Sequence, residues 1–187
     1  MTEITDNAID LGPAVQQFVL HWGEMGSQWG VNRSVAQIHA LLYLSDRPLN
    51  AEEISETLKI ARSNTSNSLK ELLGWKLIRR APVMGDRRDH YEAETDLWQM
   101  LTRIAQGRKE REIDPAVAAL GLCMAEAQGD KRLSPVARER IGAMHSFVVA
   151  MDDWYQQMIA IPPSRLMMLV AMGRRVLAFL PKGKGEK

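Results

Sequence analysis

Hydrophobic residues recur at helical spacing along most of the chain. The first pattern advances in steps of four and three and predicts one apolar helix stripe, formed by Leu11, Val15, Phe18, Trp22, Met25 and Trp29. Gly30 is expected to end this helix. A second helix is predicted to begin near Ser34, which would be its N-cap, and to end before Pro48. Its expected buried residues are Ile38, Leu41, Leu42 and Leu44.

Two shorter helices are predicted next. Asn50 followed three residues later by Glu53 is a capping-box sequence, and the helix that begins there would turn Ile54 and Leu58 inward. Another helix is expected over about 62–75. Its predicted inner side consists of Thr65, Leu69 and Leu72 or Leu73.

One β-hairpin follows, and it is the only β signal in the chain. The residues 77–81 and 90–95 are typical of short strands, and the loop between them contains Pro82, Gly85 and two arginines. The order helix, short turn, helix, hairpin is that of a winged helix-turn-helix.

The remainder of the chain is predicted to be helical. One helix is predicted from Leu97 to about Glu112, and Asp114-Pro115 and Ser134-Pro135 each predict an N-cap followed by proline at the first helical position. The second of these helices carries a stripe of Ala137, Ile141, Met144, Val148, Met151, Tyr155 and Met158. A last helix would begin at Ser164 and include Val176, Leu177 and Leu180. The charged residues 181–187 are expected to be disordered.

Composition limits the classes of function. The formal net charge is +1, so any electrostatic function must come from local segregation of charge. The start of the chain is not typical of a signal peptide, no stretch reaches the ~20 apolar residues of a membrane span, and Cys123 is the single cysteine. A cytoplasmic protein without membrane contact is therefore expected. Cys123 is interpreted as a buried small hydrophobe rather than a redox sensor.

Charge separates locally around the predicted winged helix. Between residues 61 and 90 three acids stand against seven bases, which are Arg62, Lys70, Lys76, Arg79, Arg80, Arg87 and Arg88. In the helix expected over about 62–75, the apolar residues face inward. The residues that then face outward are Arg62, Ser63, Asn64, Ser66, Asn67 and Lys70. Arginine and short polar side chains suit phosphate oxygens and base edges, so this face is predicted to contact double-stranded DNA.

Several stretches within residues 11–94 resemble the MarR-type winged-helix regulators, and most closely the GbsR branch. They are the Trp29-Gly30 step, the Arg33-Ser34 start, "ALLYLSDRPL", "KELLGWKLIRR" and "GDRRDHYEAE". The resemblance implies a dimeric DNA-binding regulator, often a repressor. It implies that residues 62–70 enter the major groove, that the wing reaches the minor groove, and that Asp86 orients Arg88. Arg87 beside them is also predicted to contact DNA.

Two residues depart from the pattern of this family. Ala61 stands where a Ser or Thr helix cap is usual, which by typical values costs ~1 kcal/mol. Lys59 stands where the turn usually has a glycine, so a non-glycine residue is expected in the left-handed region.

The expected fold class is mainly α with a small β-hairpin wing, that is, a winged helix-turn-helix plus N- and C-terminal dimerisation helices. Residues 1–30 would be a dimerisation helix, 31–95 the DNA-binding domain, 96–180 a second dimerisation region and 181–187 a tail. The apolar stripes at both chain ends are interpreted as core or as the interface of a homodimer.

A small-molecule effector is a further hypothesis. Members of the GbsR branch sense small molecules, including quaternary ammonium compounds, which aromatic rings can hold. A pocket between the first helix and the winged domain would use Trp22, Trp29 and Trp98, although packing is the favoured role for these residues and for Trp154 and Tyr155.

Other functions remain as alternatives. A winged helix can bind protein instead of DNA, but such a module has no need of the basic segment 61–90. A hydrolytic or metal-dependent enzyme would have to use His90, Asp89 and Glu92, yet the four histidines show no metal-ligand spacing. No phosphate loop, nucleophile elbow or dinucleotide motif occurs, so neither a metal nor another cofactor is expected.

Overall fold

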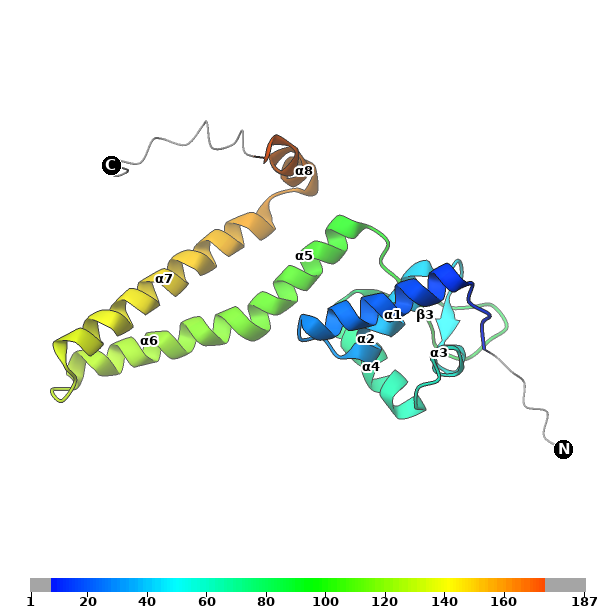
Figure 1. Ribbon diagram of the computed structural model, residues 1–187, viewed down its shortest axis with the longest axis horizontal. Coiled ribbons are helices and arrows are strands. Elements are labelled where there is room, and N and C mark those ends of the chain that lie inside the picture. Colours follow the sequence, from blue (N-terminus) through cyan, green and yellow to red (C-terminus); the bar gives the residue numbers. More distant parts are fainter. Residues whose placement is uncertain (1–7, 174–187) are drawn as a thin grey trace. The chain divides into compact units, whose positions relative to one another are not determined.

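A computed structural model describes residues 8–173 (Figure 1). Two compact units make up the chain, Met1–Ile104 and Ala105–Lys187. The fold is mainly helical with one small antiparallel sheet, which confirms the predicted fold class. Over residues 8–173, no helix combines the length and the apolar character needed to cross a membrane.

The first unit holds the winged helix. In chain order its elements are α1 (Pro13–Gln28), α2 (Arg33–Leu44), β1 (Leu49–Asn50), α3 (Ala51–Leu58), α4 (Arg62–Gly74), β2 (Ile78–Arg80), β3 (His90–Ala93) and the start of α5 (Leu97–Arg108). The strands lie in the order β1-β3-β2, with Ile78 opposite Ala93 and Leu49 opposite Tyr91. Strand β1 is an addition to the predicted hairpin, because two residues are too short for alternation to reveal them.

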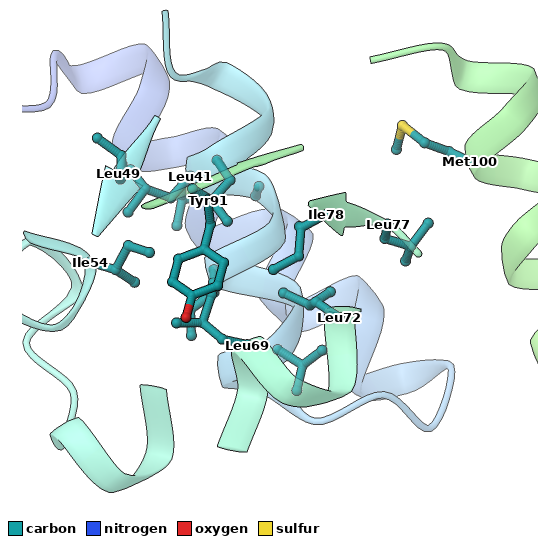
Figure 2. Close-up of a cluster of buried hydrophobic side chains, with 14 residues drawn as sticks. Leu41, Leu49, Ile54, Leu69, Leu72, Leu77, Ile78, Tyr91 and Met100 are labelled. Carbon is teal, nitrogen blue, oxygen red and sulfur yellow. The ribbon is translucent and has the colours of Figure 1, made fainter. Parts of the chain in front are cut away.

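The hydrophobic core of this unit lies where α2, α3, α4 and the sheet meet. Side chains of Leu69 and Leu72 from α4, Ile54 from α3 and Tyr91 from β3 point into one cluster (Figure 2). Thr65, Leu69 and Leu72 are buried as predicted, which leaves the opposite face of α4 to solvent. Leu44 was expected in the core but is 40% exposed, because it lies at the last position of α2, beyond the packed part of the helix.

Helix α1 packs on α2 through a narrower face than its apolar stripe predicts. Its fully buried positions are Val19 and Gly23, which the stripe omits, whereas Phe18 and Trp29 are exposed. A Cβ at Gly26 would come within 2.6 Å of the Ala36 Cβ. Small residues thus bring the two helix backbones together, and close approach rather than bulky side chains determines which face is buried.

Most of the observed turns and helix caps lie where the sequence predicts them. Asn50 and Glu53 form the predicted capping box, Lys59 is left-handed at φ 54°, and Ala61 provides no side-chain cap for α4. The predicted cap of α2 is wrong by two residues. The cap is Asn32, whose side chain accepts a hydrogen bond of 2.8 Å from the backbone N–H of Ser34.

All the regular secondary structure described in the second unit is helical. It comprises the end of α5, a π-helical turn η1 (Lys109–Ile113), α6 (Asp114–Gly129), α7 (Pro135–Ala160) and α8 (Pro163–Met172). Helices α6 and α7 lie side by side in opposite directions (Figure 1). Ser134 caps α7 as predicted, with its hydroxyl 3.1 Å from the N–H of Ala137.

Asp114 does not begin a separate helix, contrary to the prediction. The residue before it, Ile113, is already helical, so the chain passes from α5 through η1 into α6 without a break. Pro115 lacks the N–H that an α-helix needs, and the wider π-helical turn just before it accommodates that loss.

The predicted apolar stripe of α7 divides into two faces. Ile141, Val148 and Tyr155 are half-buried, whereas Met144 and Met151 are 53% and 45% exposed. Cys123 is also exposed, contrary to the prediction, because it lies on a face of α6 that no described residue covers. The predicted helical residues Val176, Leu177 and Leu180 and the tail 181–187 lie outside the described residues.

Candidate nucleic-acid interface

The outward face of α4 is polar and open to solvent. Arg62, Ser63, Ser66, Asn67 and Lys70 are all exposed, while every fully buried residue of the helix lies on the opposite side. This division follows from the 3.6-residue period, because the apolar positions face the core and leave these side chains outward. The face therefore presents hydrogen-bond donors and two cations to an approaching partner.

Asn64, the sixth residue predicted for this face, is partly engaged within the protein. Its side-chain amide donates a hydrogen bond of 2.8 Å to the Ser34 hydroxyl on α2, and the Ser68 hydroxyl lies 3.4 Å from its carbonyl oxygen. Asn64 thus ties α4 to the start of α2. Of the residues predicted on this face, it is the one that is half-buried.

The wing is a tight turn between β2 and β3 with an ordered arginine. Val83 and Asp86 form an isolated bridge, and Gly85 takes a φ of 84°, a conformation that favours glycine. Arg87 is exposed and makes no ion pair with any residue from 8 to 173, whereas Arg88 pairs with Asp86. The tip of the wing thus carries one arginine without an ion pair and one that is held.

The Asp86 carboxylate fixes the direction of the Arg88 guanidinium. Arg88 Nε donates to both oxygens of Asp86 at 3.0 and 2.9 Å, Nη2 donates at 2.5 Å, and the Arg88 backbone N–H donates at 2.9 Å. These hydrogen bonds lower the pKa of Asp86 to about 2. The contact that the family resemblance implies is therefore present, and Asp86 stays ionised well below neutral pH.

A second carboxylate, which the sequence reasoning missed, reaches both parts of this surface. Glu52 in the first turn of α3 forms an ion pair with Arg62, and its other oxygen lies 3.4 Å from Arg88 Nη1. A signal was available in the sequence, since the capping box places Glu52 close to the start of α3 beside the turn that leads to Arg62.

The remaining arginines of the wing are paired along the hairpin. Arg79 lies 2.6 Å from Glu92, its cross-strand neighbour, and Arg80 lies 3.5 Å from Asp89. Both arginines are largely exposed, so these pairs are of the surface kind that contributes little to stability. They leave the guanidinium groups on the outside of the sheet.

The base of the wing is anchored to α5. Arg103 donates to the backbone carbonyl of Lys76 and lies 3.0 Å from Glu94. Lys76 itself is left-handed at φ 57° in the turn before β2. The hairpin is therefore attached at its base while its tip extends into solvent.

A separate, mostly apolar cavity of about 200 Å³ lies between α1, α2 and α5 of the first unit. Its lining includes the stacked rings of Phe18 and Trp22, with centroids 5.5 Å apart, together with Tyr43 and Met100. His39 also lines it, is 3% exposed, and its Nε2 has no hydrogen-bond partner among the described residues.

Burial sets the charge of His39, because removing the imidazole from water lowers its pKa to about 4. The cavity is thus lined by a neutral ring with one unsatisfied nitrogen. Of the three tryptophans predicted to bind an effector, Trp22 lines the cavity. Trp29 and Trp98 do not line it, and Trp29 is 64% exposed.

The candidate enzyme site from the sequence does not assemble as a cluster. His90 is buried and holds Arg88 through its Nδ1, 2.9 Å from that residue's carbonyl oxygen, while Glu92 and Asp89 pair with arginines. Within residues 8–173, no group of three or more His, Cys, Asp and Glu side chains has a geometry suited to a metal ion.

Part of this arrangement is similar to known proteins. A model described as "MarR family" matches residues 29–89. The HTH-type transcriptional repressor GbsR of Bacillus subtilis (strain 168) is 25% identical over 100 residues, 54% of this chain and 55% of the relative. The putative HTH-type transcriptional regulator YvaV of the same organism is 24% identical over 86 residues, 46% of this chain and 49% of the relative. The matched region thus spans about half the length of each relative.

The fold is also found in a solved structure. A crystal structure described as that of a transcriptional regulator aligns with a TM-score of 0.56 at 18% identity and covers 79% of this chain and 96% of the other. This likeness concerns the fold alone. The chain thus has a winged-helix fold, and in sequence it is similar over residues 29–89 to the MarR family and over about half its length to GbsR and YvaV.

Proposed function

We propose that the protein is a transcriptional regulator that binds double-stranded DNA in a sequence-specific manner as a homodimer, and that it acts as a repressor. The single observation that carries the proposal is the exposed polar and basic face of α4 beside a wing whose Arg88 is aimed by Asp86. The proposal excludes an enzymatic role and assigns the protein to the cytoplasm.

Each part of the surface has a distinct task in this proposal. Arg62, Ser63, Ser66, Asn67 and Lys70 read base edges and phosphates in the major groove, where such side chains find donors and acceptors. Arg87 and Arg88 reach the adjacent minor groove, whose negative potential attracts arginine. Asn64 contributes through its position on α4 and its bond to Ser34.

Dimer formation is supported by an uncovered face of the second unit. Met144, Phe147, Met151 and Trp154 recur in three- and four-residue steps along α7 and are 45–62% exposed. Apolar residues at that spacing form the seam between paired helices. A second copy of the chain presents the same seam, so a two-fold contact between α7 helices would cover both.

A salt series with matched variants tests the DNA-binding proposal. Binding of a fluorescent random-sequence duplex is measured by anisotropy between about 50 and 200 mM salt, where counterion release makes affinity fall steeply. The Arg62→Ala/Arg88→Ala double variant should bind more weakly and show a smaller salt slope, by about 1 for each lost phosphate contact.

Arg132→Ala is the control for loss of charge. Arg132 is an exposed arginine of the second unit that pairs with Asp130 at 3.2 Å, so the variant should retain wild-type affinity and slope. Equal affinity and slope in the double variant and the wild type would contradict the proposal and favour a winged helix that binds protein. Sequences selected from a random library then test specificity, which Arg62→Ala and Asn67→Ala should reduce.

We propose the cavity beside Trp22 and His39 as the site of a small-molecule effector. The support is its apolar lining and the unpartnered Nε2 of a buried histidine, which together suit a small, mostly apolar molecule with one hydrogen-bonding group. Binding there would shift the population of DNA-competent dimers. A thermal-shift screen of such compounds tests this idea, and a stabilising compound should lose its effect in the Ala40→Trp variant, in which the indole fills the cavity.

A further inference from the structure

Glu52 occupies a fixed position between the two DNA-facing parts of the first unit. Its backbone N–H donates to the Asn50 side chain at 2.9 Å as part of the capping box that starts α3. From there its carboxylate pairs with Arg62, the first residue of α4, and approaches Arg88 of the wing at 3.4 Å. Its side chain is 33% exposed, whereas that of Arg62 is 74% exposed.

The three side chains border a hollow of about 380 Å³ between α3, the start of α4 and the wing. Asn50, Ala51 and Tyr91 line it on the side of the core, and Asp89 lines it on the side of the wing. The hollow is therefore flanked by two arginines from different elements, and an acid stands where their guanidinium groups converge.

Glu52 is not needed to hold the wing arginine. Without any help from Glu52, Asp86 already accepts hydrogen bonds from two nitrogens of the Arg88 guanidinium, at 2.5 to 3.0 Å. Arg62, by contrast, has Glu52 as its ion-pair partner among the described residues. Removing the Glu52 carboxylate would thus leave Arg88 in place and release Arg62.

A carboxylate and a phosphate both bind the N–H edge of a guanidinium group. Because both are anions, a phosphate that reaches Arg62 must displace Glu52 or share the cation with it. We propose that Glu52 is a specificity-determining residue, an internal competitor that occupies the place of a DNA phosphate between Arg62 and Arg88. This inference rests on the proposed DNA-binding function.

The competition weakens binding to non-cognate DNA most. On random sequence the phosphate contacts supply nearly all the affinity, so the displacement of Glu52 is not offset. On a cognate sequence Arg62 contacts a base edge, which is neutral and does not repel the Glu52 carboxylate as a phosphate does, so the ion pair is not displaced. Glu52 therefore lowers affinity for random DNA more than affinity for a cognate site.

The test uses the full chain and a random-sequence duplex. Glu52→Gln keeps the size of the side chain and removes its charge, and it should raise affinity for the random duplex about fivefold near 100 mM salt, the range set by exposed ion pairs. For a duplex selected from a random library the gain should be smaller. Glu52→Ala, which preserves the Asn50–Glu53 capping box, is the second variant and should behave alike.

Two further variants separate competition at Arg62 from a general change in charge. In the Arg62→Gln background, the gain from Glu52→Gln should fall below about twofold, because the cation it competes for is absent. Glu71→Gln removes the same charge from α4, where Glu71 forms no ion pair with a described residue. Its effect on DNA affinity should therefore be equal in the wild-type and Arg62→Gln backgrounds.

The outcomes separate this inference from the proposed function. If the wild type binds DNA but Glu52→Gln brings no gain, an equal gain on both duplexes, or a gain that survives Arg62→Gln, the role of Glu52 is overturned and DNA binding stands. If the wild type shows no salt-dependent DNA binding, both proposals are overturned.

Discussion

The two units of the chain differ in how far each buries its own apolar residues. The first encloses a core that includes Ile38, Leu41 and Ile54, each at most 1% exposed. In the second, among residues 105–173 apart from 163 and 169, only Ala127 and Asp152 are buried, while Phe147 and Trp154 are 62% and 53% exposed. A unit with its own core is stable alone, whereas one with an uncovered apolar seam is suited to pairing with another chain.

The units also differ in how they treat charge. The second unit turns Lys109 inward, where it pairs with Asp114 and lies 2.9 Å from Asp152, and these contacts raise the pKa of Lys109 and lower that of Asp152. The first unit places its cations outside, on α4 and the wing. The contrast is thus between a lysine held by two carboxylates inside the second unit and the exposed cations of α4 and the wing in the first.

The largest expected effect tests the uncovered seam. Phe147→Glu places a charge in the middle of the α7 seam and should convert a dimer into a monomer, since a buried unpaired charge is costly. Light scattering coupled to size exclusion measures the mass. Ser146→Glu, at an exposed position of α7 outside the seam, should leave the dimer intact. Dimers in both variants, or a monomeric wild type, would contradict the α7 interface.

The next effect contrasts a core leucine with an exposed one. Leu41→Ala in the first unit should lower the free energy of unfolding by about 2–5 kcal/mol, because it leaves a cavity in a closed core. Leu122→Ala, at a residue of α6 that is 69% exposed, should change it by less than about 0.5 kcal/mol. Denaturant unfolding measures both. A large loss at Leu122 would mean that the second unit buries this residue in an assembly.

A pH effect follows from the buried histidine of the first unit. The pKa of His39 is about 4 in the folded chain and about 6.5 when exposed, so the unfolded chain takes up the proton first as the pH falls. The stability is fully present above about pH 6.5 and decreases towards pH 4, with a loss of about 2 kcal/mol between pH 7 and pH 5. His39→Gln should reduce this slope in denaturant unfolding. An unchanged slope would show that His39 does not cause it.

The smallest effect concerns the close contact of α1 and α2. Helical glycine to alanine normally stabilises by up to about 1 kcal/mol, but at Gly26 the new Cβ would lie 2.6 Å from that of Ala36. Gly26→Ala should therefore destabilise the first unit by about 1–2 kcal/mol. At Gly74 an added Cβ would meet no atom within 4 Å outside its own helix backbone and chain neighbours, so Gly74→Ala should be neutral or mildly stabilising. Thermal or denaturant unfolding measures the stability of both variants. Stabilisation by Gly26→Ala would contradict the close packing of α1 on α2.

Much of the fold could be predicted because the information is local. The capping box at Asn50 and the buried face of α4 each follow from residues spaced by about one helical turn, whereas the left-handed Lys59 was implied by the family resemblance. The errors have longer-range causes. The burial of Gly23 depends on where α2 lies, and the exposure of Met151 and Cys123 depends on which helix faces are covered.

The candidate interface divides in the same way. Periodicity alone separates the outward polar face of α4 from its core face, and local charge marks the wing. The bond from Asn64 to Ser34, the ion pairs of Glu52 and the cavity around His39 join residues that are distant in sequence. No pattern of spacing reveals such pairs, because each depends on the angles at which helices and hairpin pack.

The sequence by itself determined the order of the helices and the hairpin in the winged helix, the core side of α4 and the segregation of basic residues, because hydrophobic periodicity and capping act over a few residues. Only the tertiary structure decided that Arg79 and Arg80 pair with Glu92 and Asp89, that Glu52 stands between Arg62 and Arg88, and which face of α7 remains uncovered. Those features depend on distances between separate elements, which the packing of the whole chain sets.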